Sequence, residues 1–168
     1  MSSTQLFEIF LTLELFFVSL IDLKYKKISN YWSIANILLT IGLFLFWKES
    51  YVLSLKHFAV PLGFLVVGFG LFSLKIMGAG DVKFISTFFL LLPKTDQLVF
   101  LNKIILLSVL VGFVFLLINL VKRRNELKME LYMGKLKSVY FKLGSKVPYA
   151  PVVFLAWIAN LSIKYLEI

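Results

Sequence analysis

The 168-residue chain contains no cysteine, a single histidine and only nine acidic residues. The absence of cysteine excludes disulfides, thiolate catalysis and a cysteine-ligated zinc site. Long polar stretches are scarce too, because 60% of the residues are hydrophobic, against roughly half in soluble domains. This composition indicates an all-α polytopic membrane protein, since a helix satisfies its own backbone hydrogen bonds inside lipid.

Six apolar segments follow one another along the chain, and most approach the length of about 20 residues that crosses a bilayer as a helix. The fourth is only about half as long. The segments are residues 4–22, 31–47, 58–74, 82–92, 98–121 and 149–166. We therefore predict a six-transmembrane-helix bundle that forms a single membrane-embedded domain over residues 1–168. The first segment has no basic start, so we expect a full span rather than a cleavable signal.

Basic loops account for the net charge of +9. Lys24, Lys26 and Lys27 follow the first span, and residues 122–147 hold eight Lys or Arg against two Glu. Such loops mark the cytoplasmic side and attract anionic lipids, so we expect the bilayer rather than nucleic acid as partner. Apolar residues recur at helical spacing in 122–147, which predicts a basic amphipathic segment. It would lie on the membrane surface or cover the end of the bundle.

Two aspartates lie at the edges of apolar runs, where an unpaired charge is strongly unfavourable. Asp22 ends the first span, and Asp81 follows Gly78 and Gly80. The chain crosses the membrane twice between them, and an even number of crossings returns it to the same side. We therefore expect both carboxylates at the cytoplasmic face, at similar depth.

Paired carboxylates can hydrolyse a peptide bond. Two such groups within hydrogen-bonding reach cannot both ionise, so they share one proton. The ionised group takes a proton from water, and the protonated group polarises the scissile carbonyl. Each aspartate alone has an ordinary explanation as a solvated or salt-bridged acid, so the prediction depends on the pair. It invokes no metal and no cofactor.

Three segments of the chain resemble, in order and spacing, those of type IV prepilin peptidases of the short, single-domain kind. The segments are Asp22 through Ile28-Ser29-Asn30, then Gly78-Ala79-Gly80-Asp81-Val82-Lys83, then Pro148-Tyr149-Ala150-Pro151. The resemblance covers nearly the whole chain. Ser29 stands where the family usually has Pro, and Ala150 where Gly is frequent.

This resemblance implies a GxGD-type aspartyl endopeptidase whose catalytic residues carry over to Asp22 and Asp81. The implied substrates are prepilins or pseudopilins of type IV pilus or protein secretion systems, cut just after a short basic leader. The implied location is the inner (cytoplasmic) membrane of a prokaryote, with several membrane passes. Larger members carry a cysteine-rich insertion and N-methylate the product, and this chain lacks the cysteines. We therefore expect cleavage without N-methylation.

Five further residues are predicted to bind substrate or shape loops: Gly78, Gly80, Lys83, Asn30 and Pro148. The glycines would leave the backbone open for an extended peptide at Asp81, and Asn30 would cap the second helix. Lys83 does not share a helix face with Asp81, so it would hold the loop or contact lipid phosphate.

Other polar residues are expected to have ordinary roles. Glu8 and Lys103 lie near outer helix ends and would pair, His57 would be solvated in an external link, and Lys94–Gln97 would be an external turn. Glu14 lies deeper and has no obvious partner.

Three alternative functions stay open. The chain would be a non-catalytic membrane subunit of a pilus or secretion assembly, a small transporter, or a preflagellin-type or signal-peptide-type aspartyl peptidase. Transport acids are expected near the bilayer midplane rather than at one face. Only substrate tests separate the peptidases.

Overall fold

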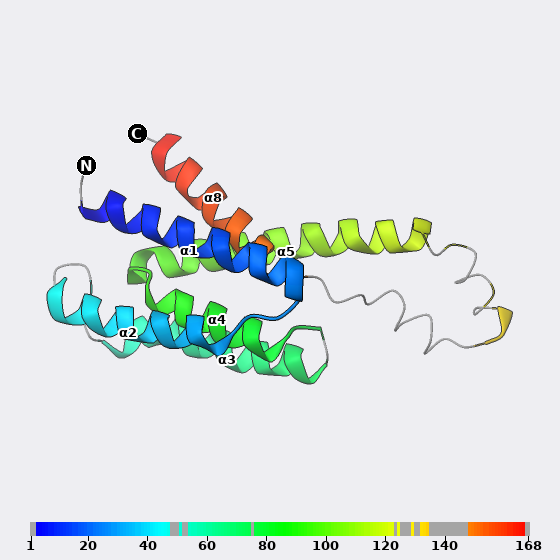
Figure 1. Ribbon diagram of the computed structural model, residues 1–168, viewed down its shortest axis with the longest axis horizontal. Coiled ribbons are helices and arrows are strands. Elements are labelled where there is room, and N and C mark those ends of the chain that lie inside the picture. The colour runs from blue at the N-terminus through cyan, green and yellow to red at the C-terminus, as the bar shows by residue number, and fades with distance from the viewer. Residues whose placement is uncertain are drawn as a thin grey trace.

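The computed structural model describes residues 3–47, 51, 54–74, 76–122, 124, 129, 132–134 and 148–166. Over these residues the chain is all-helical, without strands, and its helices run alternately in opposite directions along one long axis (Figure 1). Their bounds lie close to those of the six predicted segments. The helices are α1 (Ser3–Tyr25), α2 (Asn30–Phe46), α3 (Leu55–Ser73), α4 (Ala79–Leu90), α5 (Lys94–Lys122) and α8 (Ala150–Leu166).

The helices pack as two groups of three. In the first group α8 packs against both α1 and α5, and in the second α4 packs against both α2 and α3. Figure 1 shows the first group above the second. Asp22 lies on α1 and Asp81 on α4. Each group therefore supplies one of the two aspartates, and the packing between the groups sets their relative position.

A cluster of four aromatic rings joins the two groups. Phe88 and Phe89 of α4 contact Phe100 of α5, and Trp157 of α8 contacts Phe88 and Phe100, with ring centroids 5.6 to 5.8 Å apart. α4 has only 12 residues, a length of about 18 Å, yet half of its side chains are buried. The segment predicted as half a span is therefore an inner helix that contacts both groups.

Buried side chains bond the carbonyl groups at the end of α4. The last carbonyls of a helix have no partner within the helix, and three residues from neighbouring segments supply one here. The bonds are Tyr51–Leu91 (2.6 Å), His57–Leu90 (3.1 Å), Gln97–Phe89 (3.0 Å) and Gln97–Leu92 (3.3 Å). These contacts fix where α4 ends.

Because His57 and Gln97 bond to these carbonyls, two predictions about linking segments are wrong. His57 is not solvated in an external link; it lies in the first turn of α3 and is 1% exposed. Lys94–Gln97 is not a loop but the first turn of α5, and Gln97 is fully buried. Tyr51, between α2 and α3, is 4% exposed. Burial, with a smaller contribution from the negative charge of Asp96, raises the pKa of its hydroxyl above the ordinary value.

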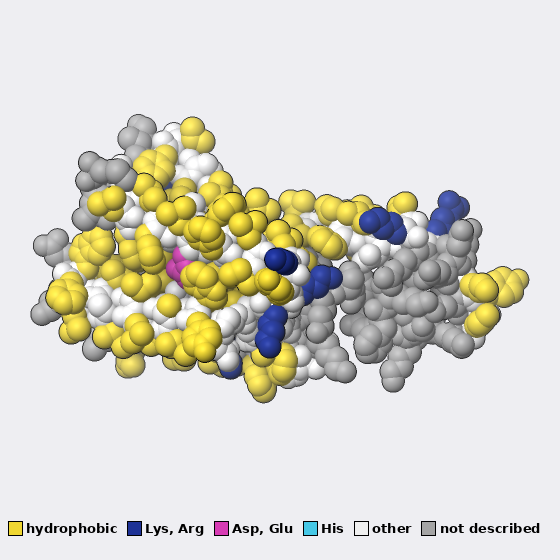
Figure 2. Space-filling model, in the orientation of Figure 1, with side chains coloured by type: hydrophobic (Ala, Val, Ile, Leu, Met, Phe, Trp, Pro, Cys, Tyr) yellow, Lys and Arg dark blue, Asp and Glu magenta, His cyan; other side chains and the backbone are white. Residues whose placement is uncertain are grey.

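The outer surface suits lipid. α3 and α5, with 19 and 29 residues, are long and apolar enough to cross a membrane, and few of their side chains are buried inside the protein. Figure 2 shows one face covered by hydrophobic side chains, with Lys and Arg gathered toward the end where α1 finishes. Large apolar surfaces of this kind mark contact with a membrane or a partner. α2 and α8 are shorter apolar helices, and the number of spans stays a prediction.

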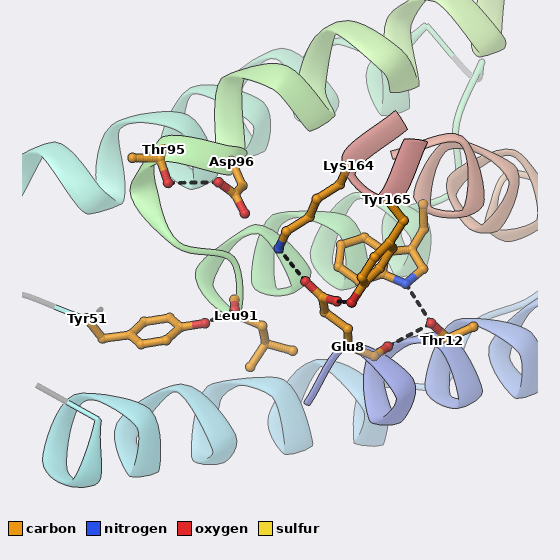
Figure 3. Close-up of polar contacts among 9 residues, drawn as sticks. Glu8, Thr12, Tyr51, Leu91, Thr95, Asp96, Lys164 and Tyr165 are labelled. Carbon is orange, nitrogen blue, oxygen red and sulfur yellow. Dashed lines mark hydrogen bonds and ion pairs between the residues drawn. The ribbon is translucent and has the colours of Figure 1, made fainter. Parts of the chain in front are cut away.

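The opposite end of the molecule is held by polar contacts between α1 and α8 (Figure 3). Glu8 forms an ion pair with Lys164 and accepts a hydrogen bond from the Tyr165 hydroxyl at 2.6 Å. Lys103 donates instead to the Asn160 side chain at 2.9 Å. The predicted pairing of Glu8 with Lys103 is therefore wrong.

Most of the predicted basic amphipathic segment, residues 122–147, lies outside the described residues. Its helix and its position on the membrane surface stay predictions. Within it, Met129, Tyr132 and Met133 are described and exposed.

Candidate active site

Asp22 lies in the last turn of α1 and is only 2% exposed. Its carboxylate accepts a hydrogen bond from the backbone N–H of Ala150, at 3.0 Å, although the two residues are 128 positions apart. The backbone N–H of Tyr149 faces the same carboxylate. Because Ala150 begins α8, the acid meets the positive end of that helix, which favours its charged form.

The backbone turns sharply just after Asp22. The N–H of Lys26 bonds to the Asp22 carbonyl at 2.7 Å, and Lys26 has a φ of 51°. This left-handed conformation ends a helix and is usually adopted by glycine there. The turn leads into residues 27–29 and α2. Ser29 is the N-cap of α2 and accepts from the Tyr31 N–H, at 3.4 Å. The prediction that Asn30 caps this helix is therefore wrong.

Asp81 lies in the first turn of α4 and is half-buried. Its carboxylate accepts the backbone N–H of Gly78, the N-cap residue, at 3.2 Å. A carboxylate in this position satisfies one of the unpaired N–H groups at the start of a helix and is stabilised by the helix dipole. Both carboxylates thus face a helix N-terminus: that of Asp81 faces the start of its own helix, and that of Asp22 faces the start of α8.

The two glycines of this segment are closely packed. A Cβ atom at Gly80 would lie 2.7 Å from the carbonyl oxygen of Ile28, and one at Gly78 would lie 3.0 Å from the Asp81 carboxylate. Contacts under 3.0 Å do not occur for real Cβ atoms without a shift. Gly80 therefore lets the loop that follows α1 lie against the start of α4. That the glycines leave room for a substrate peptide stays a prediction.

Tyr149 lies next to Asp22 and within electrostatic range of Asp81. Its backbone N–H faces Asp22, as described, and its side chain interacts electrostatically with Asp81. The Tyr149 hydroxyl donates to Ser108 on α5, at 2.6 Å, which anchors the residue. Figure 1 shows the end of α1 and the starts of α4 and α8 on the same side of the helical body. Both acids therefore lie toward the same side of the helical body, and that this side faces the cytoplasm stays a prediction.

The structure also gives the positions of the other predicted site residues, Lys83, Asn30 and Pro148. Lys83 is exposed, while Asp81 is half-buried. Asn30 is the first residue of α2, and the partly buried Pro148 directly precedes Tyr149. No group of three or more His, Cys, Asp or Glu side chains that could hold a metal occurs in the described part of the chain.

Sequence reasoning missed the roles of Tyr149 and Ala150. The segment Pro148–Pro151 carried part of the family resemblance, but only Pro148 was named as a site residue. The contact of Ala150 with Asp22 is made by a backbone N–H, which leaves no signature in side-chain chemistry. A signal was present in the proline at position 151, because proline is favoured in the first turn of a helix and so marks a helix start.

A sequence model described as the type IV leader peptidase family matches residues 9–121, more than half of the chain and a region that contains both aspartates. Neither a curated protein nor a solved structure matches the chain.

Proposed function

The chain belongs to the type IV leader peptidase family, and from this membership and the site geometry we propose that it is a membrane aspartyl endopeptidase. It removes the short basic leader from type IV prepilins or pseudopilins, with Asp22 and Asp81 as the catalytic pair. The observation that supports the proposal is that Asp22 accepts a hydrogen bond from the start of α8, while Asp81, from the other helix group, interacts electrostatically with the neighbouring Tyr149.

The pair acts as one general acid and one general base. The ionised carboxylate takes a proton from water as the water oxygen attacks the scissile carbonyl carbon. The protonated carboxyl donates its proton to the carbonyl oxygen. On collapse of the tetrahedral intermediate the C–N bond breaks: the carboxyl that took a proton from water gives it to the leaving nitrogen, and a hydroxyl of the intermediate returns its proton to the other carboxylate. The pair ends with one shared proton, as it began. Which aspartate holds that proton at the start stays open.

Two helix N-termini support this chemistry. The starts of α8 and α4 each direct backbone N–H groups at one of the acids. They favour the single negative charge that the pair must keep in an apolar environment. Neither contact needs to form during the reaction, so the charge is stabilised in advance.

The substrate enters from the side of the bundle. A prepilin stem is an apolar helix, so it lies in the bilayer while its leader junction reaches the cytoplasmic surface. An apolar groove of about 410 Å³ between α3 and the first turn of α4 is compatible with this path; Ala79, Val82 and Lys83 line it beside Asp81. The enzyme spans the inner membrane six times, with its basic loops and anionic lipid on the cytoplasmic side.

The product is not methylated by this chain. Its lack of cysteine excludes the cysteine-rich insertion of the bifunctional members. Mass spectrometry of the mature pilin N-terminus, after processing by this protein alone, is expected to show a free amine. A methyl group that depends on this chain would contradict that.

The test is leader removal in vitro. The purified full-length protein in liposomes is incubated with a candidate prepilin, beside Asp22→Asn and Asp81→Asn. Each variant is expected to insert normally and to lose nearly all processing, because removal of one member disables the pair. Ser19→Ala is the matched control, since this buried hydroxyl on α1 donates to the Leu15 carbonyl of its own helix and has no other hydrogen bond among the residues that the structure describes. Processing near the wild-type rate by either Asn variant would reject the pair.

A further inference from the structure

The boundary between α1 and α2 joins the two helix groups and is not filled by apolar packing throughout. At one end Phe7 of α1 contacts Trp47, which follows α2, with ring centroids 5.9 Å apart. At the other end the loop that joins the two helices lies against α4, where the Ile28 carbonyl faces Gly80. An apolar groove of about 900 Å³ opens along the part nearer Phe7, between residues such as Phe10 and Gly42.

A polar cluster lies on this boundary. Glu14 of α1 is 5% exposed, and Ser33 and Asn36 of α2 are 7% and 0% exposed. Five of their atoms have no hydrogen-bond partner among the described residues: both carboxylate oxygens of Glu14, the Ser33 hydroxyl, and the amide nitrogen and oxygen of Asn36. The Asn36 amide faces the Glu14 carboxyl but does not reach hydrogen-bonding geometry.

Neighbouring buried hydroxyls behave differently. Thr40 on α2 and Ser19 on α1 each bond to a carbonyl of their own helix, at 2.7 Å. Their hydroxyl groups are therefore already satisfied. A buried polar group without a hydrogen-bond partner is destabilising, so five such atoms in one cluster favour a partner that satisfies them. Buried water commonly satisfies such groups, with about three hydrogen bonds to each molecule.

We propose that Glu14, Asn36 and Ser33 form a binding site for ordered water between α1 and α2. Asn36 offers donors as well as acceptors, Ser33 offers both, and Glu14 offers acceptors. Water can both donate and accept, so it satisfies all three. A metal cation would leave the Asn36 N–H groups without a partner.

The site also positions Asp22. Glu14 precedes Asp22 by eight residues on α1, a rise of about 12 Å. Water bridges from Glu14 to α2 therefore tie α1 to the helix group that carries Asp81, midway between the contacts at its two ends. This consequence rests on the proposed function, whereas the hydration itself does not.

Hydroxyl radicals generated by X-ray irradiation oxidise side chains next to bound water, including buried ones. Leu11 and Val18 lie about one turn either side of Glu14 and are 1% and 0% exposed. In the full-length protein in detergent we expect both to be oxidised faster than Ile104 of α5, which is as buried. Asn36→Leu and Glu14→Leu should each reduce this labelling several-fold, and Thr40→Val should leave it unchanged. Equal labelling of Leu11, Val18 and Ile104 in the wild type, or unchanged labelling in both Leu variants, overturns the proposal.

A second arm measures processing. Glu14→Gln keeps the hydrogen-bonding capacity and should process substrate near the wild-type rate, whereas Glu14→Leu should be several-fold slower. Equal rates for these two variants would reject the positioning role. If the aspartate variants of the preceding section kept their activity, the proposed function would fail, and the labelling would still decide whether the water site exists.

Discussion

Gly80 shows what a single residue contributes to this site. With hydrogen in place of a side chain, it allows the Ile28 carbonyl to lie where a Cβ would come within 2.7 Å. The neighbour is backbone, which cannot swing aside as a flexible side chain would. The close approach joins the loop after Asp22 to the helix start that carries Asp81. Packing alone is sufficient to require glycine at this position.

Gly80→Ala is therefore expected to lower the free energy of unfolding by about 1–3 kcal/mol, the usual range for overpacking, and to slow processing. Thermal unfolding in detergent measures the first effect. Gly63→Ala is the matched control, because a Cβ there meets nothing within 4 Å and alanine favours a helix by about 1 kcal/mol over glycine. If Gly80→Ala unfolded at the same temperature as Gly63→Ala, the packing argument would be wrong.

At the scale of elements, α4 depends on side chains that belong to other segments. Tyr51, His57 and Gln97 bond the carbonyls at its end, and the Ser86 hydroxyl bonds to the carbonyl of Pro61 on α3, at 2.8 Å. A 12-residue helix has little stability of its own. These bonds and the aromatic cluster hold α4, and with it Asp81, in place.

Tyr51→Phe tests one of these bonds with little change in shape. Loss of the hydroxyl leaves the Leu91 carbonyl without this partner, which should lower the free energy of unfolding by about 1–3 kcal/mol. Tyr31→Phe, at a side chain that is 82% exposed, should change it little. Unfolding of both variants in the same detergent gives the comparison. Equal stabilities would show that the bond contributes nothing.

The elements were more predictable than their contacts. Continuous apolar runs predicted six helices to within a few residues, because that signal is local. The same signal misassigned His57 and Gln97, whose polarity suggested loops but whose partners are carbonyls of α4. That Asp22 and Asp81 are catalytic stays a prediction; their positions near helix ends were predictable from the apolar runs. The bond from Ala150 to Asp22 was not, because it joins residues 128 apart through backbone.

At the scale of the whole molecule, the proposed site lies where the two helix groups meet. The relative position of Asp22 and Asp81 depends on how the α1–α5–α8 group packs against the α2–α3–α4 group. The aromatic cluster, the Gly80 contact and the proposed water site all lie on that boundary. A change in the relative position of the groups would therefore alter activity without touching either aspartate.

The side of the membrane can be tested without background, since the chain has no cysteine. Single variants Lys26→Cys and Ile76→Cys, near the two aspartates, should react with an impermeant thiol reagent only after the cells are opened. Thr95→Cys, near the start of α5 at the other end of the body, should react in intact cells. Labelling of positions 26 and 76 from opposite sides would contradict the six-span arrangement.

The most direct test of the central claim is whether positions 22 and 81 meet. In the double variant Asp22→Cys/Asp81→Cys, a short homobifunctional thiol reagent should link the two side chains within one molecule. The loss of both thiols, counted by mass spectrometry, measures the link. In the control Asp22→Cys/Thr95→Cys the two thiols lie at opposite ends of the body, so the reagent should react with each thiol separately and not link them. Efficient linking of 22 to 81 is the predicted result, and its absence in membranes where both thiols react singly would contradict a shared active site.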